Sequence, residues 1–175
     1  RYHFLAYAED QYDYDASVTY VLDNYLKVSL KPLRSNKEEL SDFINDYVTD
    51  LLGYYRSFLR ILEKVESEEK YYKIFSILQL SATLYPLIIR LEARGFLENR
   101  LTVNTAKTFI DLIEIADVRV YKVRGTNPRA DMSYLAKKSR FLSAPEIEES
   151  LLDFISRFMD DSEFERRLTS EYQEA

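Results

Sequence analysis

Two local concentrations of charge are the residues of this chain best suited to chemistry. The first is acidic and lies near the start of the sequence, where four acids fall within seven residues: Glu9, Asp10, Asp13 and Asp15. Carboxylate oxygens suit a divalent cation such as Ca²⁺ or Mg²⁺. The cluster lacks the glycine and the ligand spacing of an EF-hand loop, so a solvated acidic face is the favoured interpretation. An enzyme built on this cluster is the least favoured function.

The second concentration is basic and spans residues 118–143. It contains seven Lys or Arg and one acid, a net charge of +6 in a chain whose total is −6. Such a segment can contact phosphates of nucleic acid or an acidic partner domain. The alternative is that the charges complement helix ends and pair with acidic neighbours. The candidate contact residues are Arg119, Lys122, Arg124, Arg129, Lys137, Lys138 and Arg140.

The remaining catalytic devices are missing from the sequence. It has no cysteine and a single histidine, His3, so a His-based triad, a Cys nucleophile and an HNH-type nuclease within this chain are excluded. It also has no Gly-rich phosphate loop and no His-Glu-x-x-His motif. We therefore expect no catalytic, cofactor or metal residue, and the chain by itself is not expected to be an enzyme.

The composition indicates an all-α fold. Only 3 Gly and 4 Pro occur among 175 residues, which is too few for the frequent tight turns of a sandwich, a barrel or a parallel sheet. A hydrophobic content of 46% is enough for a real core. We expect a bundle of about six to eight helices forming a single domain over residues 1–175, with a long heptad-patterned helix and a buried central helix.

The heptad pattern runs through residues 40–65. Apolar residues recur there at alternating steps of four and three, and Ser35 and Glu38 have capping-box spacing before them. A second apolar line broadens the seam, which favours a core helix of a bundle, with an intermolecular coiled coil as the alternative. The first line is Leu40, Ile44, Tyr47, Leu51, Tyr54, Phe58, Ile61 and Val65, and the second is Phe43, Val48, Leu52, Tyr55, Leu59 and Leu62.

The central helix is expected between Thr105 and Gly125, capped by Asn104 or Thr105. Its apolar residues leave little polar surface, as in a helix enclosed by others. The competing interpretation is that VRVYKV, residues 118–123, forms a β-strand. The apolar face comprises Ala106, Phe109, Ile113, Ala116, Val120 and Val123.

Other helices are expected on both sides of it. Residues 1–15 and a segment from Asp15 to Pro32 read as two helices, and residues 70–94 as a third, broken near residues 83–85 because of Pro86. DMSYLAKK, residues 131–138, forms a short helix. Ser143, Pro145 and Glu146 mark one further start, and the capping-box spacing of Ser162 and Glu165 marks the last.

The sequence offers no secretory signal and no membrane span. The longest uncharged run, residues 74–89, is short and contains polar residues and Pro86, so we expect a cytoplasmic protein without membrane contact. The chain begins at Arg1, which suggests excision from a larger multidomain protein.

The segment RVYKVRGTNPRADMSYLAKK, residues 119–138, carries a family resemblance. Arg119, Val120, Tyr121 and Lys122, then Arg129 and Ala130, then Leu135 and Ala136, resemble the helical region of GmrSD-like proteins, which are modification-dependent type IV restriction endonucleases. Those proteins have a ParB-like nucleotide-hydrolysing N-domain and often an HNH-type nuclease C-domain. The motifs of both active domains are absent here, so the resemblance implies the helical middle region alone.

The resulting functional hypothesis is a non-catalytic scaffold or linker domain of such a phage-defence nuclease, whose basic segment contacts DNA or a neighbouring domain. Its partners would be other domains of the parent chain and DNA, with a homo-oligomer as a further possibility. The alternative is a stand-alone helical interaction protein that binds a partner helix through the heptad face of residues 40–65. Salt-dependent DNA binding would favour the first hypothesis, and a dimer in solution the second.

Overall fold

The computed structural model describes Ala6 and residues 21–171, and this part of the chain is all-α, as the scarcity of turn residues predicts. Eight α-helices and several short 3-10 and π-helical segments make up the described residues, which contain no β-strand. A single isolated bridge joins Arg100 to Thr108. The acidic cluster at residues 9–15, His3 and the first expected helix lie outside the described residues.

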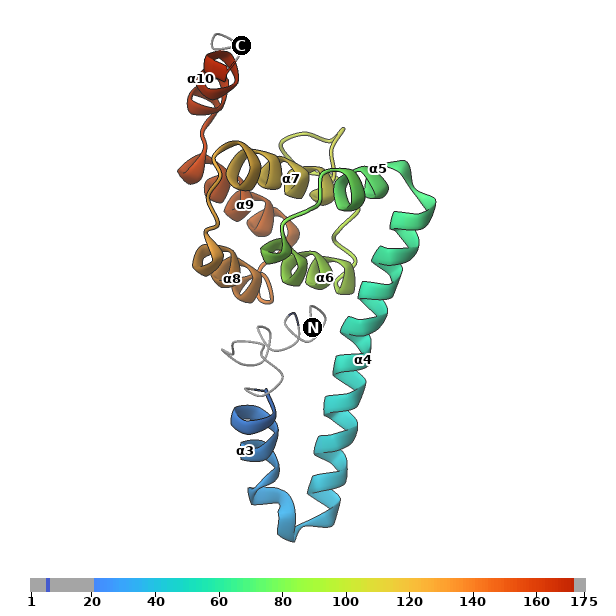
Figure 1. Ribbon diagram of the computed structural model, residues 1–175. Helices are drawn as coiled ribbons and strands as arrows, with labels where there is room; N and C mark the ends of the chain where they lie inside the picture. Colours follow the sequence, from blue (N-terminus) through green and yellow to red (C-terminus); the bar gives the residue numbers. More distant parts are fainter. Residues whose placement is uncertain (1–5, 7–20, 172–175) are drawn as a thin grey trace.

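The longest element is α4, Lys37–Ser67, which runs down one side of the molecule as an arm (Figure 1). Its 31 residues span about 46 Å at 1.5 Å per residue. The Asn36 side chain caps it by accepting hydrogen bonds from the amides of Glu38 and Glu39. The predicted capping box of Ser35 and Glu38 is therefore wrong, because Ser35 still belongs to the preceding 3-10 turn, η2, Pro32–Ser35.

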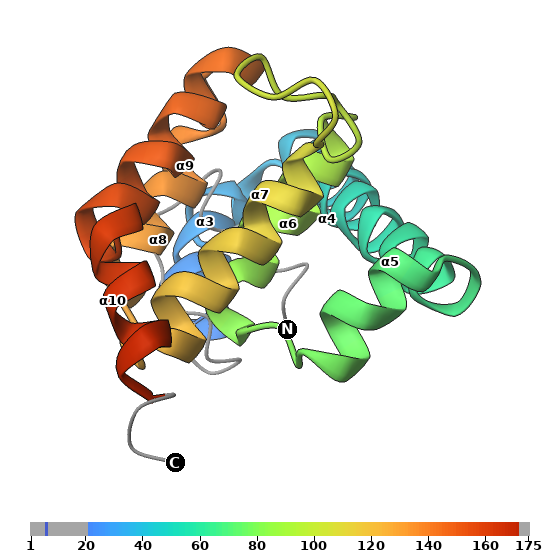
Figure 2. The same ribbon diagram turned by 90° about the horizontal axis from the view of Figure 1, so that it is seen from above.

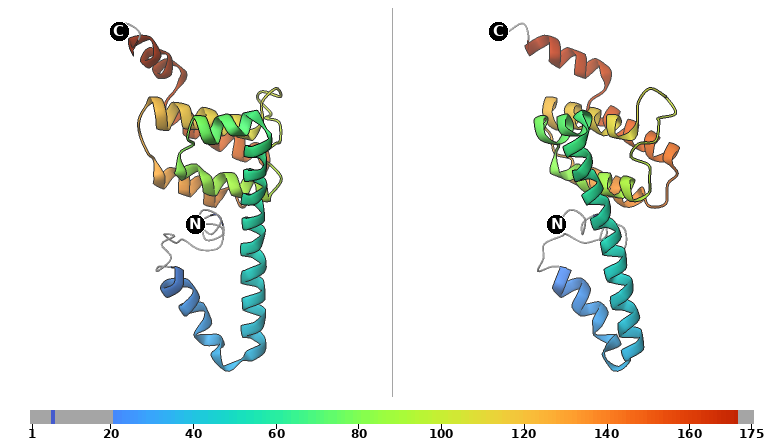
Figure 3. Two further views of the ribbon diagram at one scale, coloured as in Figure 1. Left: turned by 45° about the vertical axis from the view of Figure 1, so that its right-hand side comes forward. Right: turned by 90° about the vertical axis from the view of Figure 1, so that its right-hand side faces the viewer.

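The lower half of α4 packs against the short helical segment that precedes it in the chain. This segment comprises η1, Val21–Leu26, α3, Lys27–Leu30, and η2, and we call it the hairpin because it forms a helical hairpin together with α4. Tyr25 is buried between Phe43 and Tyr47 of α4, with ring centroids 6.3 and 5.7 Å away. Both views in Figure 3 show this hairpin beside the lower part of α4, well apart from the main bundle. The hairpin therefore covers only one face of the arm.

The third helix expected from the sequence is broken, but earlier than predicted. The chain forms α5, Glu69–Tyr72, and η3, Lys73–Ile77, then leaves the helix, and Gln79 has a φ of 52°. It resumes with η4, Ala82–Leu84, and α6, Tyr85–Ala93. Pro86 sits in the first turn of α6, where its missing N–H would have no helical partner anyway. The proline therefore starts a helix here and does not kink one.

The predicted central helix exists and is buried, although it starts later. It comprises α7, Phe109–Ala116, and the π-helical η5, Asp117–Val123, so the strand alternative for VRVYKV is wrong. Thr108 and Asp111 form a capping box at its start. Asn104 instead accepts a hydrogen bond from the Ala106 amide in the preceding turn. The helix ends as predicted before a glycine with positive φ, Gly125 at 71°.

Three helices complete the fold: α8, Arg129–Lys138, α9, Ala144–Phe158, and α10, Asp161–Glu171. Ser143 and Glu146 form the expected capping box at the start of α9. The start of α10 differs from the prediction, because the Asp160 carboxylate accepts from the Glu163 amide in place of a Ser162 and Glu165 pair.

The core lies between α6, α7, α9 and the upper end of α4. Seen from above, α7 lies between α9 and α5 (Figure 2). One face of α7 and η5 is fully enclosed. Helix α10 extends away from the bundle at the end opposite the hairpin (Figure 1). The side chains with no exposed surface include Leu87, Ile88, Ile89, Leu91, Ile110, Ile113, Ala116, Val120, Ile147 and Leu151.

Candidate interaction surfaces

The first part of the basic segment holds elements of the fold together. Arg119, on η5, forms an ion pair with Asp161 and lies over the ring of Phe164, 4.7 Å from its centroid. Both partners belong to α10. Because the side chain of Arg119 is only 23% exposed, these contacts occupy much of it and fasten α10 to the central helix.

Lys122 stabilises the break in the chain before α6. Its ammonium donates to the carbonyl oxygen of Gln79 at 2.9 Å and lies 3.7 Å from Asp117 Oδ2. Asp117 is buried, and its other carboxylate oxygen accepts a hydrogen bond from the Ser81 amide at 3.1 Å. Two side chains of η5 therefore hold the backbone at the break: Lys122 binds Gln79, whose φ is positive, and Asp117 binds Ser81.

Arg124 and Arg129 flank the turn that joins η5 to α8. The Arg124 guanidinium is 5.8 Å from the ring centroid of Phe158, at the C-terminal end of α9. Arg129 is the first residue of α8, and its amide donates to the Asn127 carbonyl oxygen in the turn before that helix.

The other three cations form a second group, at the far end of α8. Lys137, Lys138 and Arg140 lie there beside two aromatic side chains, Tyr134 and Phe141, which are 65% and 77% exposed. Lys138 Nζ is 6.0 Å from the Tyr134 ring centroid, and the Arg140 guanidinium is 5.1 Å from that of Phe141. We call these five residues the basic corner.

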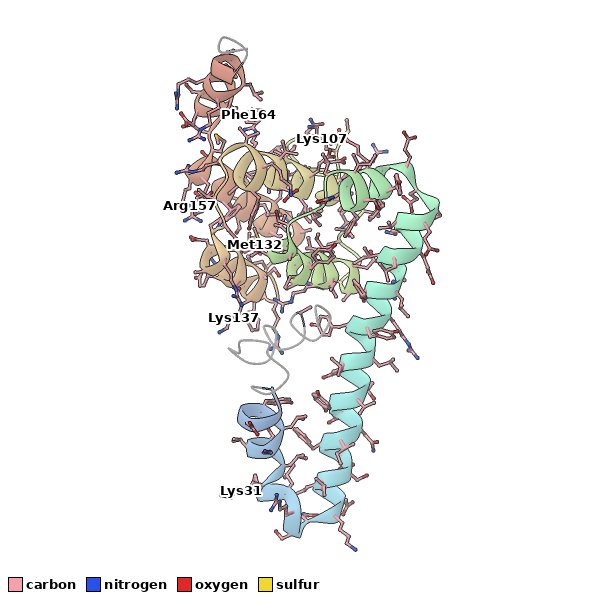
Figure 4. The ribbon with its side chains drawn as sticks, in the orientation of Figure 1. Lys31, Lys107, Met132, Lys137, Arg157 and Phe164 are labelled. Atoms are coloured by element: carbon pink, nitrogen blue, oxygen red, sulfur yellow. The ribbon has the colours of Figure 1, made fainter. Side chains whose placement is uncertain are left out.

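The seven predicted contact residues do not form one surface. Lys138 lies close enough to Glu146, at the start of α9, to help lower the pKa of that carboxyl, although hydrogen bonds from Ser143 are the main cause. Arg124 contacts Phe158 at the other end of α9, about 18 Å away along the helix axis. Figure 4 shows the same separation, with Lys137 near the hairpin end and Phe164 on α10.

The long helix α4 has an exposed apolar surface where its heptad pattern predicts core residues. Six apolar side chains of α4 form a continuous exposed line, which we call the outer stripe. The second line of the heptad pattern was expected to widen the core seam, but five of its six members are exposed. The outer stripe comprises Ile44 (45% exposed), Val48 (53%), Leu52 (39%), Tyr55 (40%), Leu59 (37%) and Leu62 (41%).

The inner face of α4 makes the contacts that the fold needs. Tyr54, Phe58 and Val65 pack against the main core, Ile61 is buried in it, and Leu51 packs against Tyr25 of the hairpin. Ile44 was expected in the core as a member of the first apolar line, but it is exposed and packs against neither the main core nor the hairpin. The sequence did contain a signal for this surface, since the two lines together are wider than one helical neighbour covers.

A shallow groove of about 680 Å³ lies between α8 and α9. Asp131, Glu149 and Asp153 supply acids to it, while Lys138 and Arg157 supply bases. Arg157 pairs with Asp131 at 3.3 Å and Asp153 at 2.9 Å, so much of the charge is neutralised within the groove. Among the described residues that line the groove, no nucleophile lies beside a histidine or cysteine.

One buried tyrosine has a strongly perturbed ionisation. Burial raises the pKa of Tyr71 above its ordinary value, and its hydrogen bond to Glu98 raises that pKa further. Lys64 bridges Glu98 and Glu92 at 3.1 and 3.4 Å, which links α4 to α6 and to the loop after it. The Tyr71 hydroxyl therefore stays protonated and donates to the Glu98 carboxylate, which ties α5 to the loop after α6.

The described residues contain no group of three or more His, Cys, Asp or Glu placed to hold a metal ion. Among the same residues, no helix has both the length and the apolar content needed to cross a membrane. Comparison of the chain with protein-family models, with curated proteins and with solved structures gives no match in any of the three. The fold and its surfaces therefore define an all-α protein whose most prominent feature is the outer stripe.

Proposed function

We propose that this chain is a non-catalytic helical scaffold that binds a helix of another polypeptide along the outer stripe of α4. The observation that carries this proposal is the line of six apolar side chains, each between 37% and 53% exposed, on a helix whose opposite face already holds the fold together. An extended apolar line at heptad spacing is the surface that a second amphipathic helix covers.

The size of the outer stripe supports a binding role. A whole large side chain has a surface of roughly 150–200 Å², so six of them at about two-fifths exposure leave on the order of 400 Å² of apolar surface open. Contiguous apolar patches of a few hundred Å² on a folded chain commonly mark an interaction site. Scattered single apolar residues would not carry the same argument.

The proposal predicts that the outer stripe is dispensable for folding. We expect the double variant Leu52→Glu, Leu59→Glu to keep its helix content and its Tm within about 2 °C, because surface substitutions usually change stability by less than about 0.5 kcal/mol. Circular dichroism during thermal unfolding of the dilute protein measures both quantities.

The matched control is Ile61→Glu on the same helix, where the side chain is 1% exposed. Burying an unpaired charge there should abolish the cooperative transition or cost more than about 4 kcal/mol. If the Leu52→Glu, Leu59→Glu variant were destabilised as severely as this control, the outer stripe would be part of the core and the proposed function would fail.

A second proposal follows from the resemblance of residues 119–138 to GmrSD-like type IV restriction endonucleases. In such a protein this chain would be the scaffold between two active modules, in contact with nucleic acid. The basic corner is the surface that favours this proposal, since two exposed aromatic rings beside cations are suited to stacking on bases and neutralising phosphates. The cations of η5 are less suited, because Arg119 and Lys122 are engaged within the fold.

Salt-dependent binding tests this second proposal. Fluorescence anisotropy with a labelled single-stranded oligonucleotide should show binding at low salt, and Lys138→Ala with Arg140→Ala should lower the slope of log K against log salt by roughly one unit per cation. The charge-matched control is Arg34→Ala with Lys37→Ala. It changes two exposed cations at the start of α4, away from the basic corner, and should leave the slope unchanged. Absence of binding at low salt would remove the proposal.

A further inference from the structure

We propose that an open groove between α4 and the C-terminal end of α6, which we call the arginine groove, binds the phosphate group of a small molecule. Its volume of about 460 Å³ lies within the range of small-molecule sites. The arginine groove and the outer stripe lie on different faces of α4, so this site goes beyond the proposed function. The lining residues on which the proposal rests are Asp50, Gly53, Arg56, Ser57 and Arg60 of α4, and Arg94 at the end of α6.

Three arginines make the arginine groove positive. Arg56 and Arg60 lie one turn apart on α4, and Arg94 lines the groove from the end of α6, which lies beside α4 (Figure 1). A guanidinium stays charged and offers several planar N–H donors that match phosphate oxygens. Asp50 is the one acid among the described lining residues, so three bases against one acid leave a charge of +2. A phosphate dianion complements this charge.

Arg94 is held in place before any ligand binds. Its Nη1 atom donates to the carbonyl oxygens of Ser139 and Leu142, the latter at 2.8 Å, and its guanidinium lies 4.3 Å from the ring centroid of Phe96. These bonds use one of its three nitrogens, so Nε and Nη2 keep donors for a ligand. A side chain that is already ordered loses little conformational entropy on binding.

Arg60 is oriented by its own set of contacts. Its Nε donates to Glu92 and its Nη2 to the hydroxyl of Ser57, both at 2.9 Å. Ser57 is buried and donates in turn to the Gly53 carbonyl oxygen at 3.0 Å. Glu92 also pairs with Lys64, at 3.4 Å, so it neutralises Arg60 only in part. The fold therefore fixes two of the three guanidiniums.

Gly53 leaves open space in the arginine groove. A glycine inside a helix destabilises it relative to alanine. Packing within the described chain does not require this glycine, because a Cβ at position 53 would have nothing within 4 Å of it. The missing side chain leaves room for a ligand to approach the helix one turn before Arg56. A bound phosphate would give this otherwise unfavourable glycine a role.

The charges that flank the arginine groove favour a small ligand over a polymer. Asp42 and Asp46 are exposed on the same face of α4 before the groove, and Glu63 is exposed close to that face after it. An extended polyanion such as nucleic acid would meet these acids at both ends and be repelled. A single phosphate ester would contact the arginines alone.

Phosphorus NMR of inorganic phosphate, titrated with the full chain at constant ionic strength, tests the site. We expect saturable line broadening with a Kd on the order of 1 mM, and Arg56→Ala should weaken binding about tenfold because a charge-assisted hydrogen bond is lost. Arg34→Ala, which removes an exposed arginine from the turn before α4, is the matched control and should change little. The double variant Lys138→Ala, Arg140→Ala should also bind normally, since it alters only the basic corner.

Two substitutions with opposite expected effects test the geometry. Gly53→Ala should raise Tm by about 2–4 °C through helix propensity, yet weaken phosphate binding several-fold because a methyl group occupies the groove. Asp50→Asn should tighten binding several-fold, because it removes the carboxylate that repels the anion. Unchanged binding in both variants would overturn the placement of the phosphate in the arginine groove.

Competition identifies the source of the phosphate. Glycerol 3-phosphate should displace inorganic phosphate, whereas a ten-nucleotide single strand at equal phosphate concentration should not, when both are measured in the Lys138→Ala, Arg140→Ala background. Displacement by the oligonucleotide would overturn the assignment to a small molecule. Binding that is absent, or that is insensitive to Arg56→Ala, would overturn the site itself. None of these results involves the outer stripe, so the helix-binding function stands or fails separately.

Discussion

Phe109→Ala is expected to lower the free energy of unfolding by about 3–5 kcal/mol, the range for removing a fully buried phenyl ring. Phe109 is 1% exposed and opens the central helix. Its amide donates to Asn99, and that of the next residue, Ile110, donates to Leu97, so the loop before α7 converges on this position. A cavity here would loosen the contact between the loop and the core. Thermal unfolding should show Tm lower by on the order of 10 °C.

The control for this prediction is Phe141→Ala, which removes the same ring from a residue that is 77% exposed. It should change stability by no more than about 0.5 kcal/mol, because little apolar surface leaves water there on folding. Equal effects at both positions would mean that Phe109 is not enclosed and that α7 is not the centre of the core.

Glu148→Ala should lower the free energy of unfolding by about 2–3 kcal/mol, because the Glu148 carboxylate ties the long loop before α7 to α9. Glu148 is 2% exposed. One oxygen accepts from the amide and the hydroxyl of Thr102, at 2.7 and 2.8 Å, and the other accepts from the amide of Val103, at 3.0 Å. Chemical denaturation at neutral pH measures the loss, and the exposed neighbour Glu149→Ala should show almost none.

The contribution of Glu148 should depend on pH. Burial by itself raises the pKa of this carboxyl, but the hydrogen bonds from Thr102 and Val103 together lower it below its ordinary value of 4.5. The folded state therefore binds the proton less readily than the unfolded state does. The stabilisation is fully present above the unfolded-state pKa and is lost as the pH falls through the lower folded-state pKa.

Comparison of wild type and Glu148→Gln across this range measures the effect. Their difference in unfolding free energy should be constant from pH 7 down to about pH 5 and should shrink at lower pH. A difference that stays the same at the lowest pH at which both proteins fold would show that the carboxylate charge contributes nothing and that only packing at this position matters.

Features that depend on local sequence were predicted well. The all-α class follows from few turn residues and helical periodicity, and the capping box of Ser143 and Glu146 and the stop at Gly125 follow from residue chemistry within one turn. Errors arose where several candidates compete for the same role. Asn36 replaces Ser35 as the cap of α4, and Thr108 replaces Asn104 before α7. In each case the residue nearer the apolar run forms the cap.

The break before α6 was misplaced for a different reason. Pro86 is the only local signal there, and it is compatible with a kink as well as with a first helical turn. The actual break lies at residues 78–81, where Lys122 and Asp117 hold the backbone of Gln79 and Ser81. These contacts join positions some 40 residues apart, so no window of sequence contains them.

The basic segment shows the same limit. The sequence establishes that seven cations lie between residues 118 and 143. In the structure the chain turns between η5 and α8, and this turn separates the seven cations into two groups. Arg119 faces α10 and Lys122 faces the break, while the basic corner lies at the other end of α9. The charge count alone therefore could not show whether these residues share a surface.

By itself, the sequence determined the helical class, the buried central helix and the existence of two apolar lines along α4. Only the tertiary structure decided that the line containing Phe58 and Ile61 is covered by the fold and that the line containing Leu52 and Leu59 is open. The physical reason is that periodicity fixes which residues share a face of a helix. Which face is covered depends on where distant segments pack, and here both the hairpin and the bundle pack on the same one.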